Sequence, residues 1–546
     1  MGHPPGWPHT DSATAIICHH IDYFPDKTRR AGFRSNFWAR IQRLQEARTA
    51  LGIILRKPFL IFISGLTRRL LETADEYRLS AWLFLKLLAV IYFVAFLSLA
   101  VQITGLVGPH GILPFGERLA DIYNNFGPEA WWRLPTLFWL GSNNLSLQVA
   151  AYAGCFFSIT LLLGWKQRLS LILLFVLYLS LFHAGQTFLT FQWDTLLLET
   201  GFLAIFLVDH PTRLVIFLYY WLLFRLRFLS GISKLLSNDP SWSGLTALLY
   251  YFETQPLPHV GAWYAHHLPD WVLQDGVLLV FFIEIVVPFF IFLPRRFRLF
   301  AAFSTILLQL LIIATSNHNF VNLLTILLCL LLLDDRIINR IIPHGLQQRI
   351  IDRIKQPHLA QQFLTVLFSL IIFTTGLATG YRMLSNQPLP DQLNEATRLV
   401  RFYGLGHTYH IFPTMQVERH ELEVQGSMDG RNWLTYDFKY KPGPLDRRPA
   451  FIVPHQPRLD WMIWFVPGQH EENMIWMDRF MRRLWEGSPE VLDLLRSNPF
   501  PDRPPRRLRV MVYRYHFTTP DERKQTGNWW KRELLGEFPF VPPRRP

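Results

Sequence analysis

The chain has 546 residues and a formal net charge of +13; half of its residues are hydrophobic and 17% are charged. Soluble globular proteins carry about a quarter charged residues, so this composition argues against an entirely soluble protein and indicates a membrane protein with soluble parts. Lys and Arg occur in short clusters beside apolar runs, such as Arg68 with Arg69, which is typical of topology determinants. We therefore expect no nucleic-acid binding.

Residues 1–80 are polar and basic, and we expect them to form a cytoplasmic N-terminal region. Their one apolar stretch, 51–64, is interrupted by Arg56 and Lys57 and is short for a span, which favours an interfacial helix. The first 30 residues lack the basic-then-apolar pattern of a signal peptide. The first membrane helix is therefore expected to direct targeting.

Residues 81–383 are predicted to be a transmembrane helical bundle of about nine spans. Several of the runs are shorter than the ~20 residues of a free-standing span, so any of these can be re-entrant. The nine apolar runs are 81–101, 149–165, 169–185, 194–209, 213–229, 277–293, 298–314, 319–333 and 361–383.

The connecting loops indicate an orientation. With a cytoplasmic N-terminus, the cytoplasmic loops are 164–168, 209–213, 294–298 and 334–356. Three of these four hold two or more Lys or Arg, whereas positive charge is sparse in the loops on the opposite side. The positive-inside rule thus predicts an N-in/C-out arrangement.

Residues 384–546 change in composition, and we predict a mostly β, sandwich-like extracytoplasmic domain there. The segment 422–443 alternates apolar and polar residues around an Asp-Gly turn, which indicates a hairpin. The segment 508–519 reads as another strand, and some helix is expected around 471–496.

The fourth apolar run, FQWDTLLLETGFLAIFL (191–207), carries Asp194 and Glu199. Five residues correspond to about 500° of helical rotation and about 7.5 Å of rise, so the two carboxylates face different directions. They are not a paired acid and base. In the N-in/C-out arrangement Asp194 lies at the outer interface, and Glu199 lies deeper in the outer leaflet.

Neighbouring runs bring further charges to a similar depth, and we predict an intramembrane polar cluster of Asp194, Glu199, Arg225, Arg227 and Glu284. Buried intramembrane charges usually pair with one another or face a cavity. Structural ion pairing between helices and a client-facing or catalytic cavity both remain open.

Lys234 follows in the loop-rich stretch 227–258. It is either an interfacial anchor or a desolvated base, because burial lowers the pKa of a lysine. The His-His pairs at 19–20 and 266–267 lack helical i, i+4 spacing or a carboxylate partner. We expect neither a metal site nor a bound cofactor.

Several motifs resemble the lipase maturation factors: GLVGPHGILPF (105–115), FQWDTLLLETGFLAIF (191–206), AWYAHHLP (262–269), YKPGPLDRRPAFIVPHQPRLDWMIWF (440–465) and TGNWW (526–530). Together with 225–258 and 498–518, the resemblance covers roughly 90–546. It implies a multi-pass protein of the endoplasmic reticulum membrane whose lumenal C-terminal domain helps lipoprotein lipase and related clients to fold and assemble. In a bacterium the matching place is the plasma membrane. The family implies fewer than nine spans.

Two shorter stretches carry weaker likenesses. GISKLLSNDPSW (231–242) is similar to the lysine-containing stretch of the vitamin K-dependent γ-carboxylases, in which the lysine activates a reduced quinone. The likeness implies Lys234 as the catalytic position. SMDGRNW (427–433) is similar to a hairpin of discoidin-like sandwiches.

Two functions follow. The first is a non-catalytic maturation factor whose partners are membrane lipid and secreted clients. Its client-binding candidates are Trp433, Trp461, Trp464 and Trp529, for which packing in a β core is the alternative, together with Arg458 and Asp460 at the rim of a core strand. The second is a membrane enzyme acting on a quinone or lipid-like substrate with Lys234 as base.

Overall fold

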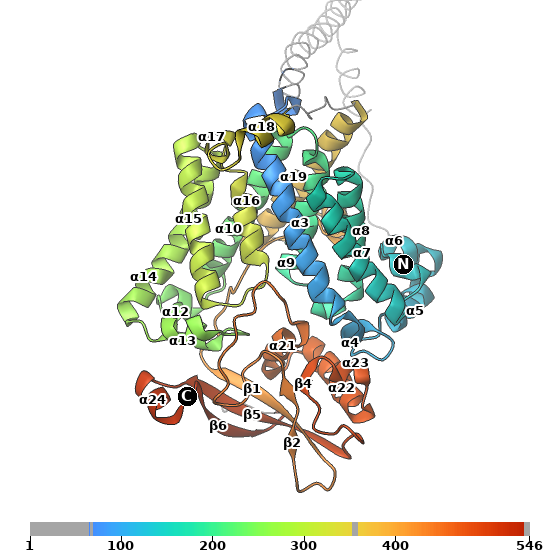
Figure 1. Ribbon diagram of the computed structural model, residues 1–546, viewed down its shortest axis with the longest axis vertical. Coiled ribbons are helices and arrows are strands. Elements are labelled where there is room, and N and C mark those ends of the chain that lie inside the picture. The colour runs from blue at the N-terminus through green and yellow to red at the C-terminus, as the bar shows by residue number, and fades with distance from the viewer. Residues whose placement is uncertain (1–64, 66–68, 352–358, 540–546) are drawn as a thin grey trace, which may run out of the picture. The chain divides into compact units, whose positions relative to one another are not determined.

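A computed structural model describes residues 65, 69–351 and 359–539, and the chain divides into two compact units, Met1–Glu72 and Thr73–Pro546. The interfacial helix predicted at 51–64 lies outside the described residues. The second unit contains a helical bundle and a C-terminal region with two small sheets (Figure 1).

Seven helices of the described chain are long and apolar enough to cross a membrane. Each coincides with one of the predicted apolar runs, because uninterrupted apolar sequence of this length satisfies its backbone polar groups as a helix. They are α3 (Arg78–Ala100, preceded by η1, Asp75–Tyr77), α7 (Asn144–Leu163), α8 (Gln167–Ala184), α10 (Arg213–Leu236), α14 continued by η5 and η6 (Asp270–Phe281, Phe282–Val286, Val287–Phe292), α15 (Arg295–Thr315) and α19 (Leu359–Ser385).

Two of the nine predicted runs form helices that are shorter than a free-standing span. The fourth run forms α9 (Gln192–Leu207), which has 16 residues. The eighth run forms α16 (Val321–Leu330), which has 10 residues. The polar sequence before α16 and the Pro-containing turn after α9 limit the length of these helices. By length and composition the described part of the chain therefore has seven candidate spans rather than nine.

Polar contacts identify the helix ends that lie together. The amide of Ala74, before α3, donates to Pro211 O at 2.7 Å, just ahead of α10. Arg168 Nη2, at the start of α8, donates to Val208 O at 3.1 Å, just after α9. Ser80 Oγ in the first turn of α3 donates to Leu333 O at 3.0 Å, beyond α16. The short helices α9 and α16 thus end where α3, α8 and α10 begin.

Short helices connect the long ones. Those that link α3 to α7 carry several exposed aromatic residues, among them Trp131 and Trp132. The connecting elements are α4 (Ile103–Val107), α5 (Phe115–Phe126), η2 (Gly127–Glu129), α6 (Ala130–Arg133), η3 (Leu137–Leu140), η4 (Gln186–Phe188), α11 (Pro240–Ser243), α12 (Ala247–Thr254), α13 (Val260–His266), α17 (Asp335–Ile338) and α18 (His344–Ile351).

The C-terminal region follows α20 (Asp391–Phe402) and mixes strands with helices. One sheet has the antiparallel order β2-β1-β5-β6 and the other pairs β3 with β4. The elements are β1 (Arg419–Ser427), β2 (Leu434–Thr435), β3 (Asp437–Phe438), α21 (Arg458–Met462), η7 (Ile463–Gly468), α22 (Glu471–Glu486), α23 (Pro489–Leu492), β4 (Leu495–Ser497), β5 (Arg507–Phe517), α24 (Pro520–Thr526) and β6 (Trp530–Glu537). The prediction of a mostly β sandwich therefore overstated the strand content.

The predicted hairpin and the predicted strand at 508–519 are confirmed. β1 pairs with β2 through Gln425 and Thr435, and β5 covers most of the second run. Between β1 and β2, Gly430 has a φ of +76°, and the Asp429 carboxylate accepts the amide hydrogens of Arg431 and Asn432 at 2.8 Å. These backbone hydrogen bonds hold the pKa of Asp429 well below its usual range.

The segment PHQPRLDWMIWF is helical, so the prediction of a core strand there was wrong. It forms α21 and η7. All residues from Gln456 to Ile463 are buried, so this short run has no one-sided pattern that would distinguish a helix from a strand.

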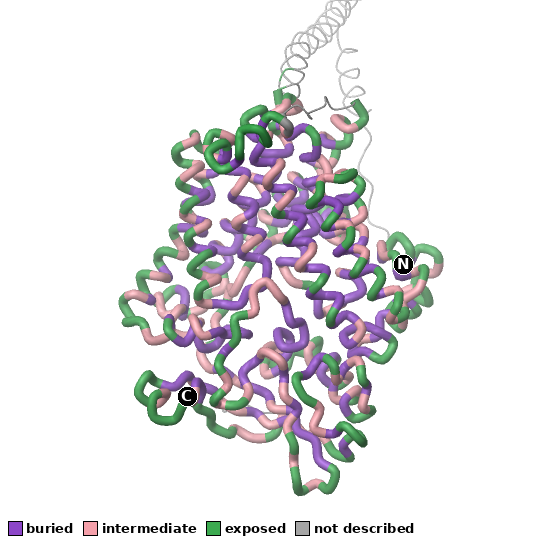
Figure 2. Tube along the Cα trace, in the orientation of Figure 1, coloured by how far each residue is buried: buried purple, intermediate pink, exposed green. Residues whose placement is uncertain are grey.

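Hydrogen bonds attach the C-terminal region to the bundle. Gln102 Nε2, after α3, donates to Gln456 O at 2.8 Å, and Asn317 Nδ2 donates to Ala450 O at 2.8 Å. The buried Arg419 of β1 donates to the carbonyl oxygens of Glu253 and Pro256, at 2.9 and 3.0 Å. Figure 2 shows buried chain continuing from the bundle interior into this region, whereas α14 and α15 present many exposed residues.

Candidate functional site

The predicted intramembrane charges lie in three separate buried groups, each completed by residues of the C-terminal region. The carboxylates of Asp194 and Glu199 are fully buried, and Glu284 is 5% exposed. Charged groups in such surroundings are stable only when they are paired and their remaining lone pairs accept hydrogen bonds.

Asp194, in the first turn of α9, pairs with Arg458 of α21. Arg458 Nη1 and Nη2 each donate to one carboxylate oxygen at 2.7 Å, which is a bidentate geometry. Tyr178 Oη of α8 donates to Asp194 Oδ1 at 2.7 Å, and Arg458 Nη1 also donates to Phe188 O. Arg458 is 1% exposed, so it lies in the core and not at the rim of a strand as predicted.

Glu199 pairs with Arg225 of α10, which donates to it through Nη2. The second carboxylate oxygen accepts from Tyr409 Oη at 3.0 Å and from the amide of Gly406 at 3.1 Å. Gly406 has a φ of +65°, a conformation that glycine adopts without strain, so its amide can reach Glu199. Arg225 Nη1 donates to His407 O at 3.0 Å.

Glu284, in the π-helical turn η5, accepts from two cations of α10. Arg227 Nη2 donates to Oε1 and Lys234 Nζ donates to Oε2, both at 2.7 Å. Lys234 Nζ also donates to Ser230 O and Ile411 O, each at 3.0 Å. Its three protons are therefore all engaged, and an ammonium fixed in this way gives no support to a role as catalytic base.

The structure thus separates the predicted cluster into the pairs Asp194–Arg458 and Glu199–Arg225 and the triad Arg227–Glu284–Lys234. The entry of residues 403–412 into the bundle was not predictable from the sequence, because a backbone amide or carbonyl has no sequence signature. The stretch GLGHTYH (404–410), with two glycines and Tyr409, is the nearest indication.

A cavity of about 100 Å³ adjoins the triad, lined by apolar residues of α14, α15 and α16, by the two charged side chains of α10 and by the chain near Ile411. Tyr251 Oη and His318 Nε2 share a hydrogen bond of 2.5 Å beside it. Burial lowers the pKa of His318 to about 4, so this imidazole is neutral at pH 7.

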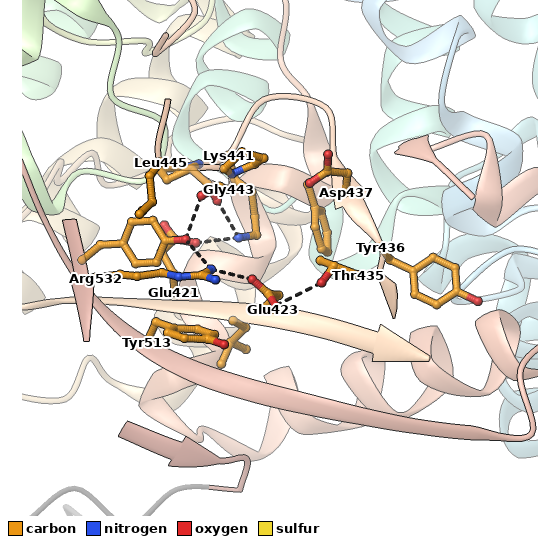
Figure 3. A pocket seen from close by; sticks show the side chains of 15 residues that line it. Glu421, Glu423, Thr435, Tyr436, Asp437, Lys441, Gly443, Leu445, Tyr513 and Arg532 are labelled. Atoms are coloured by element: carbon orange, nitrogen blue, oxygen red, sulfur yellow. Dashed lines mark hydrogen bonds and ion pairs between the residues drawn. The ribbon is translucent and has the colours of Figure 1, made fainter. Parts of the chain in front are cut away.

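The C-terminal region has a separate and more polar pocket of about 360 Å³ between β1, β5, β6 and residues 441–445. In Figure 3, Glu423 is joined to both Arg532 and Thr435; the distances are 2.6 and 3.0 Å. Burial raises the pKa of Glu423, but the hydrogen bonds from Arg532, Gln425 and Thr435 outweigh it and keep this pKa below its usual range. The pocket therefore presents an ionised carboxylate and a guanidinium side by side.

The four tryptophans proposed for client binding are buried or half-buried. Trp461 and Trp529 are 3% and 6% exposed, which corresponds to the core-packing alternative. Trp433 and Trp464 are half-buried; the Arg509 guanidinium lies 4.0 Å from the Trp433 ring centre, and Trp464 Nε1 donates to Thr254 O at 2.7 Å.

Asp460 is also buried, and its carboxylate accepts the amide hydrogens of Tyr440 and Lys441 at 2.7 and 2.9 Å. Burial raises its pKa above the usual range, although the two amides oppose this shift. Asp460 therefore anchors the loop after β3 and does not lie at the rim of a strand.

Comparison with known proteins places these elements in context. The sequence pattern described as "Lipase maturation factor transmembrane domain" matches residues 79–340, and the one described as "Lipase maturation factor C-terminal domain" matches residues 405–541. No solved structure matches the chain.

Individual relatives match over most of their length. Lipase maturation factor 2 of Xenopus laevis is 34% identical over 585 aligned positions, covering 85% of this chain and 82% of the relative. The human lipase maturation factor 2 is 33% identical over 84% of this chain and 82% of the relative. Mouse lipase maturation factor 1 is 34% identical over 84% of this chain and 86% of the relative.

Proposed function

Because the chain belongs to the lipase maturation factor family, we propose that it is a membrane-bound factor that assists the folding and assembly of secreted client proteins. The name of the relatives suggests lipases as the clients. The factor would act without catalytic chemistry of its own. The observation that carries this proposal is the co-occurrence of both family regions in one chain, joined through the buried Asp194–Arg458 pair.

We place the client contacts on the C-terminal region. Its polar pocket offers ionised Glu423 and Arg532 together with the hydroxyl of Tyr513, which suits hydrogen bonding to a partly folded chain. The half-buried Trp433 and Trp464 of the same region remain candidates for client contact.

We further propose nine membrane segments in the N-in/C-out orientation, with the C-terminal region on the extracytoplasmic side. Contacts at the starts of α3 and α8 support this proposal. The end of α16 lies beside the start of α3 and the end of α9 beside the start of α8, so both short helices run antiparallel to these neighbours. The clustered Arg and Lys of the loops near 164–168 and 294–298 support the orientation. The membrane is that of the endoplasmic reticulum, or the plasma membrane in a bacterium.

A comparison of secreted proteins from cells with and without the gene tests the function. We expect one or more secreted proteins, lipases first among them, to lose activity in the deletion strain and to recover it with the wild-type gene. Identical secreted activities in the two strains would contradict the proposal.

Lys234 variants test whether chemistry is involved. Arginine can pair with Glu284 as lysine does but cannot act as a base near neutral pH. A non-catalytic factor therefore predicts that Lys234→Arg restores client activity, with protein level measured in the same cells. Loss of client activity at normal Lys234→Arg protein level would favour a catalytic lysine.

A further inference from the structure

The cavity beside Glu284 combines an apolar wall with buried polar groups. Its apolar side is formed by residues such as Leu308 and Ile312 of α15, Val280 of α14 and Val321 of α16. The polar side is formed by the triad of Arg227, Glu284 and Lys234, together with other polar residues of the lining. A space of this composition suits the end of an amphiphile, with a polar head and an apolar chain.

The charges around the cavity do not balance. Arg227 and Lys234 are both within 2.7 Å of the single carboxylate of Glu284, which leaves one excess positive charge among the described lining residues. The nearby carboxylate of Asp239 is not part of the lining. It accepts backbone amide hydrogens from Ser241 and Met415, at 2.7 and 2.6 Å. His318 in the lining is neutral at pH 7, because burial lowers its pKa. An uncompensated cation in a low-dielectric site is costly, and an anion in the cavity would offset that cost.

Several buried polar atoms of the lining have no partner. Arg227 Nε, Trp242 Nε1 and Gln309 Nε2 are unpartnered donors, and Asn322 Oδ1 is an unpartnered acceptor. The four side chains belong to residues that are 2–3% exposed. Buried donors without partners are rare in folded proteins, so each of them requires an explanation. The predominance of donors over acceptors favours a ligand rich in acceptor oxygens.

The local backbone is unusual as well. Glu284 lies in η5, a π-helical turn, and such turns occur frequently at functional sites. On α15, Leu307, Leu310 and Leu311 are about half exposed and are close in sequence to Leu308, which lines the cavity. An acyl chain therefore has an apolar surface beside the cavity along which it can extend.

We propose that this cavity binds the carboxylate end of a single-chain acyl lipid, a long-chain fatty acid, with Arg227, Trp242 and Gln309 donating to the carboxylate oxygens. The small volume accommodates the head and the first methylenes, and the rest of the chain lies against α14 and α15. This binding function goes beyond the assistance of clients and does not depend on it.

Photolabelling of the purified full-length protein tests the proposal. The probe is palmitate carrying a diazirine near its carboxylate end, and labelled peptides are mapped by mass spectrometry. We expect labelling of the α10 segment near Arg227 or of the α15 and α16 segments that line the cavity. Palmitate should compete at a concentration at least about tenfold lower than hexadecanol, which has the same chain and no charge. Equal competition by the alcohol would overturn the proposal.

Matched variants locate the site. Leu308 lines the cavity, whereas its neighbour Leu307 is 53% exposed. Leu308→Trp fills the space and should lower labelling about tenfold, and Leu307→Trp should leave it unchanged. Trp242→Phe keeps the ring above Lys234 and removes one donor, so it should lower labelling severalfold even if Leu308→Trp fails to fold. Wild-type labelling in Trp242→Phe and in any folded Leu308→Trp protein would refute the site.

A competition arm with lysophosphatidate distinguishes the two sources of an anionic head. A carboxylate site predicts that palmitate is the stronger competitor, because the phosphate head and glycerol need more room than the cavity provides. Stronger competition by lysophosphatidate would overturn the assignment to a fatty acid.

Discussion

Asp194 and Arg458 are 264 residues apart in the chain and form a bidentate pair that is almost fully buried. Neither side chain is near water, so removing one partner leaves a buried charge without compensation. Such a loss typically costs about 3–5 kcal/mol, far more than an exposed ion pair contributes. The pair therefore contributes chiefly to how the C-terminal region is seated on the bundle.

Asp194→Ala should lower the apparent unfolding temperature of the detergent-solubilised protein strongly, corresponding to about 3–5 kcal/mol. The matched control is Glu117→Ala, which breaks an exposed pair with Arg479 between α5 and α22 and should cost less than about 1 kcal/mol. A double variant, Asp194→Leu with Arg458→Met, should recover part of the loss. Equal effects of Asp194→Ala and Glu117→Ala would contradict this account.

His455 gives the docked C-terminal region a pH dependence. Its Nδ1 shares a hydrogen bond of 2.9 Å with Ser98 Oγ of α3, and burial lowers its pKa to about 4, helped by the charge of Arg458. The unfolded chain binds a proton at about pH 6.5 and the folded chain does not. The stabilisation is therefore complete above about pH 6.5 and is lost as the pH falls toward 4, by at most about 1.4 kcal/mol per unit.

Unfolding temperatures measured between pH 7.5 and 4.5 test this dependence. His455→Gln should make the loss of stability below pH 6.5 shallower, with His318 still contributing, whereas His470→Gln, at an exposed histidine, should leave the profile as in the wild type. Superimposable profiles for the wild type and His455→Gln would show that another group is responsible.

At the scale of elements, the contact between α10 and η5 depends on a glycine. A Cβ at Gly231 would lie 2.8 Å from Glu284 Cβ and 2.7 Å from Ile285 Cγ1. The absence of a side chain thus lets α10 approach the π-helical turn closely enough for both Arg227 and Lys234 to reach Glu284.

Gly231→Ala should therefore destabilise the protein by about 1–3 kcal/mol, because the added methyl group forces the two elements apart. Gly380→Ala on α19 is the control, since a Cβ there meets nothing within 4 Å and alanine favours the helix. The unfolding temperatures of the two variants, compared with that of the wild type, test this expectation. A Gly231→Ala protein as stable as Gly380→Ala would mean that the contact can relax.

The elements were predictable where length and periodicity carry the signal. The long apolar runs and the β1–β2 hairpin follow directly from the sequence, because a membrane span and an Asp-Gly turn have local signatures. The helix at Arg458–Met462 was not predictable in the same way, since its short apolar run fits strand and helix alike. Tertiary packing against the bundle decides between them.

At the scale of the whole molecule, the proposed orientation assigns each loop to one side of the membrane. In a Cys18→Ser background the remaining cysteines, Cys155 and Cys329, are buried. Arg431→Cys, at the exposed hairpin tip, should react with a membrane-impermeant maleimide in intact protoplasts or sealed vesicles of matching orientation. Trp165→Cys, on the opposite side, should react after permeabilisation. Reversed reactivity would overturn the N-in/C-out proposal.

The charged residues of the site were identifiable from the sequence, but most of their partners were not. Asp194, Glu199 and Glu284 stand out because charge is rare in apolar runs. Arg458 and Tyr409, which complete two of the groups, lie far away in the C-terminal region, where an arginine or a tyrosine is unremarkable. Helical rise gives depth but does not specify which distant segment enters the bundle.

The entry of residues 406–411 into the bundle sets an order for biosynthesis. Glu199 and Lys234 are synthesised and inserted well before the amide of Gly406 and the carbonyl of Ile411 emerge from the ribosome. During that interval the earlier helices hold buried polar groups that lack part of their final set of hydrogen-bond partners. Arg458, the partner of Asp194, is synthesised last of these partners, so the buried pairs of the bundle are complete only after the chain has passed residue 458. Nascent chains shorter than this should be preferred substrates of membrane quality-control proteases.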